Sequence, residues 1–173
     1  MRLAEWFGRW RASRGYGVHS PLAFRIVKRV VRPDRGVCYY GEEALHDARA
    51  KLLLRFVAEM QPAYVWVSPG MPENLLEAIR LAGGVVRLYD GAVFPDDFDK
   101  ADLVVLYRFE LKKAQLKKIL TPGHSLIGFG LKPRFIAWVG DLMKGGVILD
   151  GAGSLMAVAT SDPALHSYRV SRF

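Results

Sequence analysis

The residues best placed for chemistry lie within residues 64–90. Ser68 and Gly70 follow an apolar run, and Asp90 ends the next apolar run, about 20 residues after the turn. Between the two runs, residues 72–82 have the apolar spacing of a helix, which a pair of glycines ends. A strand, a glycine-containing turn, a helix and a strand ending on an acid form half of a nucleotide-binding βαβ unit. The stretch therefore predicts a nucleotide-type site, with fewer glycines in the turn than such sites usually have.

His19 lies outside this stretch and has the chemistry of a general base. It is in a glycine-containing loop directly before Ser20 and Pro21, a favourable N-cap and a favourable first helical residue. Because a histidine titrates near neutral pH, His19 could accept a proton from a substrate or contact one. The same position also suits a residue that only fixes the loop, which is the more common role.

The apolar spacing along the chain predicts an α/β fold. Predicted helices cover residues 3–12, 21–32, 41–60, 72–82, 110–120 and 133–143, and predicted strands cover residues 64–68, 85–89, 102–107, 125–129, 147–150, 155–160 and 166–173. Strands that alternate with helices imply right-handed crossovers and parallel pairing, whereas the last strands favour an antiparallel hairpin. We expect residues 1–60 to form a helical section packed on a Rossmann-like core of residues 61–173, in a single structural domain.

Two loops bear on how a nucleotide would be held. Residues 91–100 form an acidic loop that has no room for a further strand and helix. Residues 150–154, with the sequence DGAGS, look like an acid followed by a phosphate-binding glycine loop. Such a loop needs a helix and another parallel strand after it, so we interpret Gly151 and Gly153 as turn residues of the hairpin.

The positive charge is concentrated near the N-terminus. The net charge is +8, and residues 1–36 contain nine Arg and Lys residues but only two acids. This balance favours anionic partners at long range, yet no RNA-binding motif accompanies it, so we do not expect nucleic acid as the partner. A helix over residues 3–12 would bring Trp6, Phe7 and Trp10 together, which suits a membrane interface or docking on the chain itself or a dimer mate. We favour the docked helix.

The composition also argues against several kinds of site and location. Cys38 is the only cysteine, so the sequence offers no internal disulfide and no cysteine-based zinc site. The four histidines lack the spacing of metal ligands, and we expect no metal. No apolar run reaches the roughly 20 residues of a membrane span, and the N-terminus lacks the apolar region of a signal peptide. We therefore expect a cytoplasmic protein without a membrane span.

The order of these elements resembles that of class I S-adenosylmethionine-dependent methyltransferases. The segment GYGVHSP from Gly15, the pair Tyr39 and Tyr40, the strand DLVVLY from Asp102 and the ending GGVILD…SYRVSRF fit a bacterial methyltransferase-like group. The resemblance covers nearly the whole chain as architecture. It implies a Rossmann-like methyltransferase sheet, mostly parallel with an antiparallel C-terminal hairpin and smaller by one strand–helix unit, and it implies S-adenosylmethionine as the cofactor.

The resemblance assigns cofactor contacts to four residues. Gly70 matches the first glycine of the family turn, and Ser68 stands where the family has an acid at the end of the first strand. Pro72 and Asn74 occupy later glycine positions of that turn. Asp90 matches the acid that accepts hydrogen bonds from the ribose hydroxyls. The departures at Ser68, Pro72 and Asn74 indicate a degenerate cofactor motif.

Three functions follow from these observations. The first is S-adenosylmethionine-dependent methyl transfer to an unknown small-molecule or protein acceptor, with His19 or Tyr107 as the base. Tyr107 ends the DLVVLY strand, where metal-dependent relatives have an acid, so metal-assisted transfer is not expected. The second is a non-catalytic methyltransferase-fold protein that binds a partner or forms a homodimer through its N-terminal helices. The third is a basic nucleic-acid-binding module, which only the charge supports.

Overall fold

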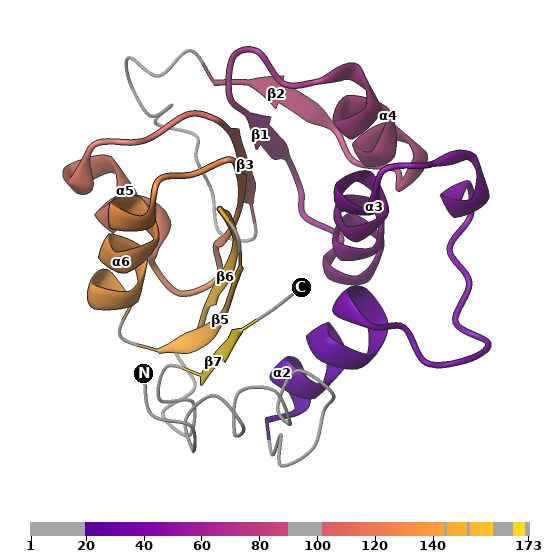
Figure 1. The fold of residues 1–173 in the computed structure, drawn as a ribbon, viewed down its shortest axis with the longest axis horizontal. Helices are drawn as coiled ribbons and strands as arrows, with labels where there is room; N and C mark the ends of the chain where they lie inside the picture. Colours follow the sequence, from indigo (N-terminus) through magenta and orange to yellow (C-terminus); the bar gives the residue numbers. More distant parts are fainter. Residues whose placement is uncertain (1–19, 90–101, 144, 152, 161–167, 172–173) are drawn as a thin grey trace.

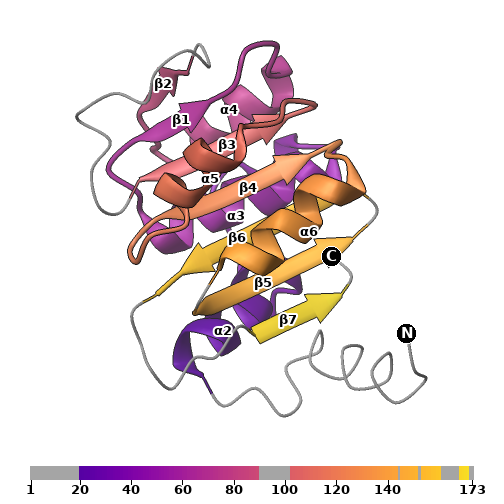
Figure 2. The same cartoon turned by 90° about the vertical axis from the view of Figure 1, so that its left-hand side faces the viewer.

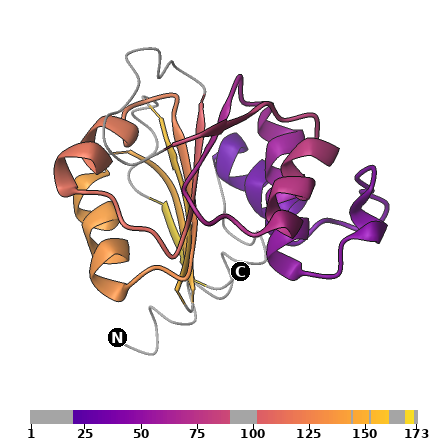
Figure 3. The same ribbon diagram turned by 90° about the horizontal axis from the view of Figure 1, so that it is seen from above.

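The computed structural model describes residues 20–89, 102–143, 145–151, 153–160 and 168–171. The predicted helix over residues 3–12, the acidic loop, His19 and Asp90 lie outside the described residues. In the described part, helices cover both faces of one sheet, so the chain forms three layers (Figure 1; Figure 3). No helix in these ranges is long and apolar enough to cross a membrane.

The middle layer is a seven-stranded sheet with the order β2-β1-β3-β4-β6-β5-β7 (Figure 2). The strands are β1 (Val65–Val67), β2 (Val86–Leu88), β3 (Leu103–Tyr107), β4 (Ser125–Phe129), β5 (Gly146–Gly151), β6 (Ser154–Ala159) and β7 (Tyr168–Ser171). All neighbours pair in parallel except β6, which is antiparallel to both β4 and β5. This confirms the predicted α/β fold, with a mostly parallel sheet and an antiparallel C-terminal hairpin, and it is compatible with a Rossmann-like architecture.

The outer layers consist of two groups of helices. The first group, on one face of the sheet, contains α2 (Pro21–Arg25), the π-helix η1 (Ile26–Val31), the 3₁₀-helix η2 (Glu42–Ala44), α3 (Ala48–Met60) and α4 (Glu73–Leu81). The second group, α5 (Lys113–Ile119) and α6 (Pro133–Leu142), covers the opposite face (Figure 3). Residues of α2, η1 and α3 therefore pack in one hydrophobic cluster with strand residues on the same face of the sheet.

The strands separate two hydrophobic clusters because their side chains alternate between the faces. Val65 and Val67 pack in the cluster with α3 and α4, whereas Trp66 between them packs in the cluster with α5 and α6. Leu103 and Val105 of β3 also pack in the cluster with α3 and α4. Both faces of the central strands are thus buried, which explains why these strands read as continuous apolar runs.

Two predicted helices begin later in the structure than the spacing indicates. The prediction of a helix from residue 41 was wrong at its start, because Asp47 is in an extended conformation and its carboxylate accepts a hydrogen bond from the Arg49 amide at 2.8 Å. Such a side-chain acceptor makes Asp47 the N-cap of α3. The helix predicted from residue 110 begins at Lys113, since Lys112 is also extended, with ψ 150°.

Candidate functional site

The edge of the sheet where the parallel strands end is the candidate site. Strands β1 to β5, all parallel to one another, have their carboxyl ends on this edge. The strand order reverses at β1, with β2 on one side and β3 on the other. In open α/β sheets, ligands bind outside the carboxyl ends of the strands at such a switch point.

Ser68 follows β1 and is fully buried. Its hydroxyl accepts a hydrogen bond from the backbone amide of Tyr107 at 2.9 Å, and its own amide donates to the carbonyl of Val105 at 3.0 Å. The residue therefore joins the end of β1 to the end of β3. The hydroxyl is part of the sheet and has no exposed surface toward a ligand.

Gly70 forms an open turn after Ser68. Its φ is +73°, a left-handed conformation that favours glycine, and a Cβ atom added there would have no neighbour within 4 Å. The backbone of the turn is exposed and nothing in the described structure covers it. This is the geometry that a close backbone approach to a ligand requires.

Asn74 lies in the first turn of α4, and its side-chain amide donates to the second carboxylate oxygen of Asp47 at 3.0 Å. The other oxygen of Asp47 already accepts the α3 capping bond. The contact is exposed and ties the start of α4 to the start of α3. In this structure the Asn74 amide has a structural partner at the place where the resemblance puts the cofactor.

Tyr107 ends β3 and is half-buried, with its ring against the hydrophobic cluster under α3 and α4. The guanidinium carbon of Arg108 lies 5.4 Å from the centre of that ring, within the range of a cation–π contact. Arg108 has φ +49°, which few non-glycine residues adopt, and its amide donates to the carbonyl of Phe129 at 2.8 Å. Backbone conformations of this kind cluster at functional sites, which makes Arg108 a candidate site residue that the sequence did not indicate.

A pocket of about 390 Å³ opens farther along the same edge. It lies between the first group of helices and the ends of β4 and β5. Its described lining residues are Val31, Ala48, Arg49, Lys51, Leu52, Arg55, Phe129, Gly151 and Ser154.

Residues 41–60 contain no predicted site residue, although α3 supplies most of this lining. The signal was present in the spacing: Ala48, Lys51, Leu52 and Arg55 stand at i, i+3, i+4 and i+7 and share one side of the helix. Two cations thus occur on a stripe that also contains a buried leucine. The other walls come from η1 and the hairpin, which no local pattern connects to α3.

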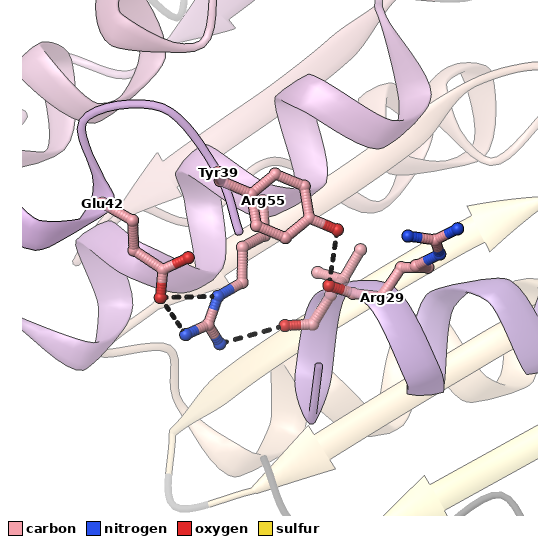
Figure 4. A network of polar contacts seen from close by, with 5 residues as sticks. Arg29, Tyr39, Glu42 and Arg55 are labelled. Atoms are coloured by element: carbon pink, nitrogen blue, oxygen red, sulfur yellow. Dashed lines mark hydrogen bonds and ion pairs between the residues drawn. The ribbon is translucent and has the colours of Figure 1, made fainter. Parts of the chain in front are cut away.

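Arg55 is fixed in the wall of the pocket by a network of polar contacts (Figure 4). Its Nε donates to Glu42 at 3.0 Å and its Nη2 contacts the same carboxylate oxygen, while its Nη1 donates to the carbonyl of Val30 at 3.3 Å. The side chains of Arg55 and Glu42 are only 18% and 19% exposed. One guanidinium therefore connects α3 with both η2 and η1.

Tyr39 strengthens the same connection. Its hydroxyl oxygen lies 2.7 Å from the carbonyl oxygen of Arg29 and 2.8 Å from Oε1 of Glu59, so its single proton has two acceptors (Figure 4 shows the contact with Arg29). Burial raises the pKa of the Tyr39 hydroxyl above its ordinary value, and the hydrogen bond to Glu59 and that carboxylate's charge raise it further. The hydroxyl thus remains protonated and keeps residues 37–41 against η1 and α3.

The charge of the pocket is positive. Within the part of the chain that the structure describes, the side chains of Arg49 and Lys51 have no hydrogen-bond or ion-pair partner. None of the described lining residues is acidic. Arg55 is paired with Glu42, so Arg49 and Lys51 carry the uncompensated charge.

Metal ligands do not gather at this edge or elsewhere in the described ranges, where no three His, Cys, Asp or Glu side chains come together as a metal site. When the chain is compared with protein-family models, with curated proteins and with solved structures, it has no match in any of the three. Its function must therefore be argued from its own fold and residues.

Proposed function

We propose that this chain is a methyltransferase-like protein of the class I S-adenosylmethionine-dependent type, and that it binds a ligand at the carboxyl edge without transferring a methyl group. The observation that carries the proposal is the sheet. The order of its parallel strands reverses at β1, as in nucleotide-binding folds, and its C-terminal hairpin inserts the antiparallel β6 between β4 and β5. An antiparallel C-terminal hairpin on such a sheet is what the resemblance to these enzymes implies.

The described residues fit S-adenosylmethionine poorly. This poor fit supports a non-catalytic protein that binds another ligand, rather than an active methyltransferase. Gly70 leaves its turn open, but the hydroxyl of Ser68 is buried and accepts a bond from Tyr107. The amide of Asn74 is bound to Asp47. We therefore derive no methyl-transfer step for this chain.

An active methyltransferase is the second candidate, and the open turn at Gly70 together with the spacing to Asp90 favours it. In such an enzyme the small-molecule or protein acceptor would lie between the ends of β1 and β3, with Tyr107 or His19 as the base. His19 and Asp90 are outside the described residues.

Calorimetric titration with S-adenosylmethionine and S-adenosylhomocysteine distinguishes the two candidates. We expect no saturable heat and no thermal shift at millimolar concentrations of either compound, since a ligand that binds the folded protein must stabilise it. Saturable binding that Asp90→Ala abolishes, while the exposed control Asp141→Ala leaves it intact, would instead favour the second candidate. Binding that Asp90→Ala does not change would refute the assignment of the ribose contact to Asp90.

A further inference from the structure

We infer that the pocket between α3 and the ends of β4 and β5 binds a small organic anion, whose acidic head group contacts Arg49 and Lys51. The apolar part of this ligand packs against Val31 and Leu52. The inference rests on the proposed function, because it names the ligand class of the carboxyl edge that we propose to be a binding site.

The pocket has uncompensated positive charge. Arg49 and Lys51 line the pocket, and neither side chain has an ion-pair partner among the residues that the structure describes. The pocket is at the amino-terminal part of α3, a helix of 13 residues, where the helix dipole adds positive partial charge. Charges of one sign beside an apolar wall attract a counter-ion more strongly than the same charges in open solvent.

Two acidic residues next to α3, Asp47 and Glu42, could oppose this charge. Asp47 precedes Ala48 in the chain, but it does not line the pocket, and both of its carboxylate oxygens accept hydrogen bonds, from the Arg49 amide and from Asn74. Glu42 is likewise paired with Arg55. The two nearby acids are therefore committed to structural contacts.

The size and lining of the pocket also suit a small organic ligand. Its volume of about 390 Å³ is within the range of small-molecule sites, toward the lower end. Val31 and Leu52 provide an apolar wall, and Ser154 at the start of β6 adds a hydroxyl that can donate or accept. An apolar wall with a few converging polar groups is typical of such sites.

The helix α3, which carries Arg49 and Lys51, is held in place before a ligand binds. The Arg55 contacts connect α3 with η1 and η2, and Val31 of η1 is itself part of the lining. A π-helix such as η1 is rare and is frequently found at functional sites. A site whose walls are already fixed loses less entropy when it binds.

The test is calorimetric titration of the full chain with benzoate and with phenyl phosphate, using neutral benzyl alcohol as the matched uncharged probe. We expect saturable binding of at least one anion and binding of the alcohol that is at least about tenfold weaker, since charge-assisted hydrogen bonds would be absent. A preference for benzoate or for phenyl phosphate identifies the head group as carboxylate or phosphate.

The double variant Arg49→Gln/Lys51→Gln should weaken anion binding by about tenfold or more. The control Lys113→Gln/Lys117→Gln removes the same charge from exposed positions of α5, on the other side of the sheet, and should change the affinity by less than about twofold. Equal losses in both variants would mean that only the net charge matters, and the inference would be wrong. Absence of saturable anion binding, or equal binding of benzyl alcohol, would overturn it as well.

A steric variant checks the location independently of charge. Ala48 is the exposed first residue of α3 and lines the pocket, so Ala48→Trp should block binding without disturbing the core. Unchanged anion binding in Ala48→Trp would place the anion elsewhere and refute the inference. These titrations contain no S-adenosylmethionine, so anion binding can fail or succeed separately from the cofactor test of the proposed function.

Discussion

The two ends of the carboxyl edge use their polar side chains differently. At the β1 end, the hydroxyl of Ser68 and the amide of Asn74 are occupied by contacts within the protein. At the β4–β5 end, Arg49 and Lys51 have no partner among the described residues, while Arg55 is fixed by Glu42. Polar groups in the first region hold the fold together, whereas Arg49 and Lys51 in the second region are available to a ligand.

This difference bears on the cofactor site that the resemblance implies at the β1 end. A cofactor site needs exposed polar groups at the strand ends, and a side chain that bonds to a neighbouring strand no longer supplies one. Gly70 keeps its turn open, but an open turn alone supplies no polar side chain to a cofactor. Substitutions at the β1 end should therefore change stability, and substitutions at the pocket should change binding.

The largest effect is expected at Arg55, because both stability and ligand binding depend on this residue. Arg55→Met removes two charge-assisted contacts with Glu42 and the bond to Val30, so we expect a loss of about 1.5–3 kcal/mol in the free energy of unfolding. Because α3 then loses this polar connection to η1, binding of benzoate or phenyl phosphate should weaken as well. Urea denaturation and calorimetry measure the two effects.

Arg80→Met is the matched control, since Arg80 forms a 2.5 Å pair with Glu73 on α4 at a position that is 57% exposed. An exposed pair contributes little, so this change should cost less than about 0.5 kcal/mol. Similar losses in Arg55→Met and Arg80→Met would show that the Arg55 contacts have no special role in the pocket wall.

A smaller effect, on stability alone, is expected at the β1 end. Ser68→Ala leaves the amide of Tyr107 without its acceptor next to a fully buried position, which should cost about 1–3 kcal/mol in urea denaturation. Anion binding at the pocket should not change. Asn74→Ala removes an exposed hydrogen bond in the same region and should cost at most about 0.5 kcal/mol. If Ser68→Ala instead alters anion binding, the two regions are not independent.

An effect between those of Ser68→Ala and Asn74→Ala is expected for Tyr39→Phe, which removes the hydroxyl near Glu59 and the Arg29 carbonyl and should cost about 0.5–1.5 kcal/mol at neutral pH. The pKa of Tyr39 is raised in the folded protein above its ordinary value of 10.0. The unfolded chain therefore loses this proton first, and the stabilisation disappears as the pH rises above 10.0.

The comparison of wild type with Tyr39→Phe isolates this titration, because all other groups are shared. The difference in unfolding free energy between the two proteins should be constant below pH 10.0 and should shrink above it. A difference that grows at alkaline pH would contradict the raised pKa.

The sequence by itself determined the elements of the core. The strand at residues 125–129 and the hairpin after residue 146 lie where the apolar runs and turn residues predict them. Gly146 illustrates the local control, since its φ of +132° and the approach of the Val158 carbonyl leave no room for a side chain. Such features depend on a few neighbouring residues, so a local pattern contains them.

Only the tertiary structure decided which polar residues are occupied and which are available. The bond between Ser68 and Tyr107 joins residues 39 positions apart, and the contact between Asn74 and Asp47 joins residues 27 positions apart. The pocket likewise combines η1, α3, β4 and the hairpin, which are adjacent only in the folded chain. A serine that completes a sheet and a serine that meets a ligand look the same in a sequence, because the difference is in the group that faces each hydroxyl after folding.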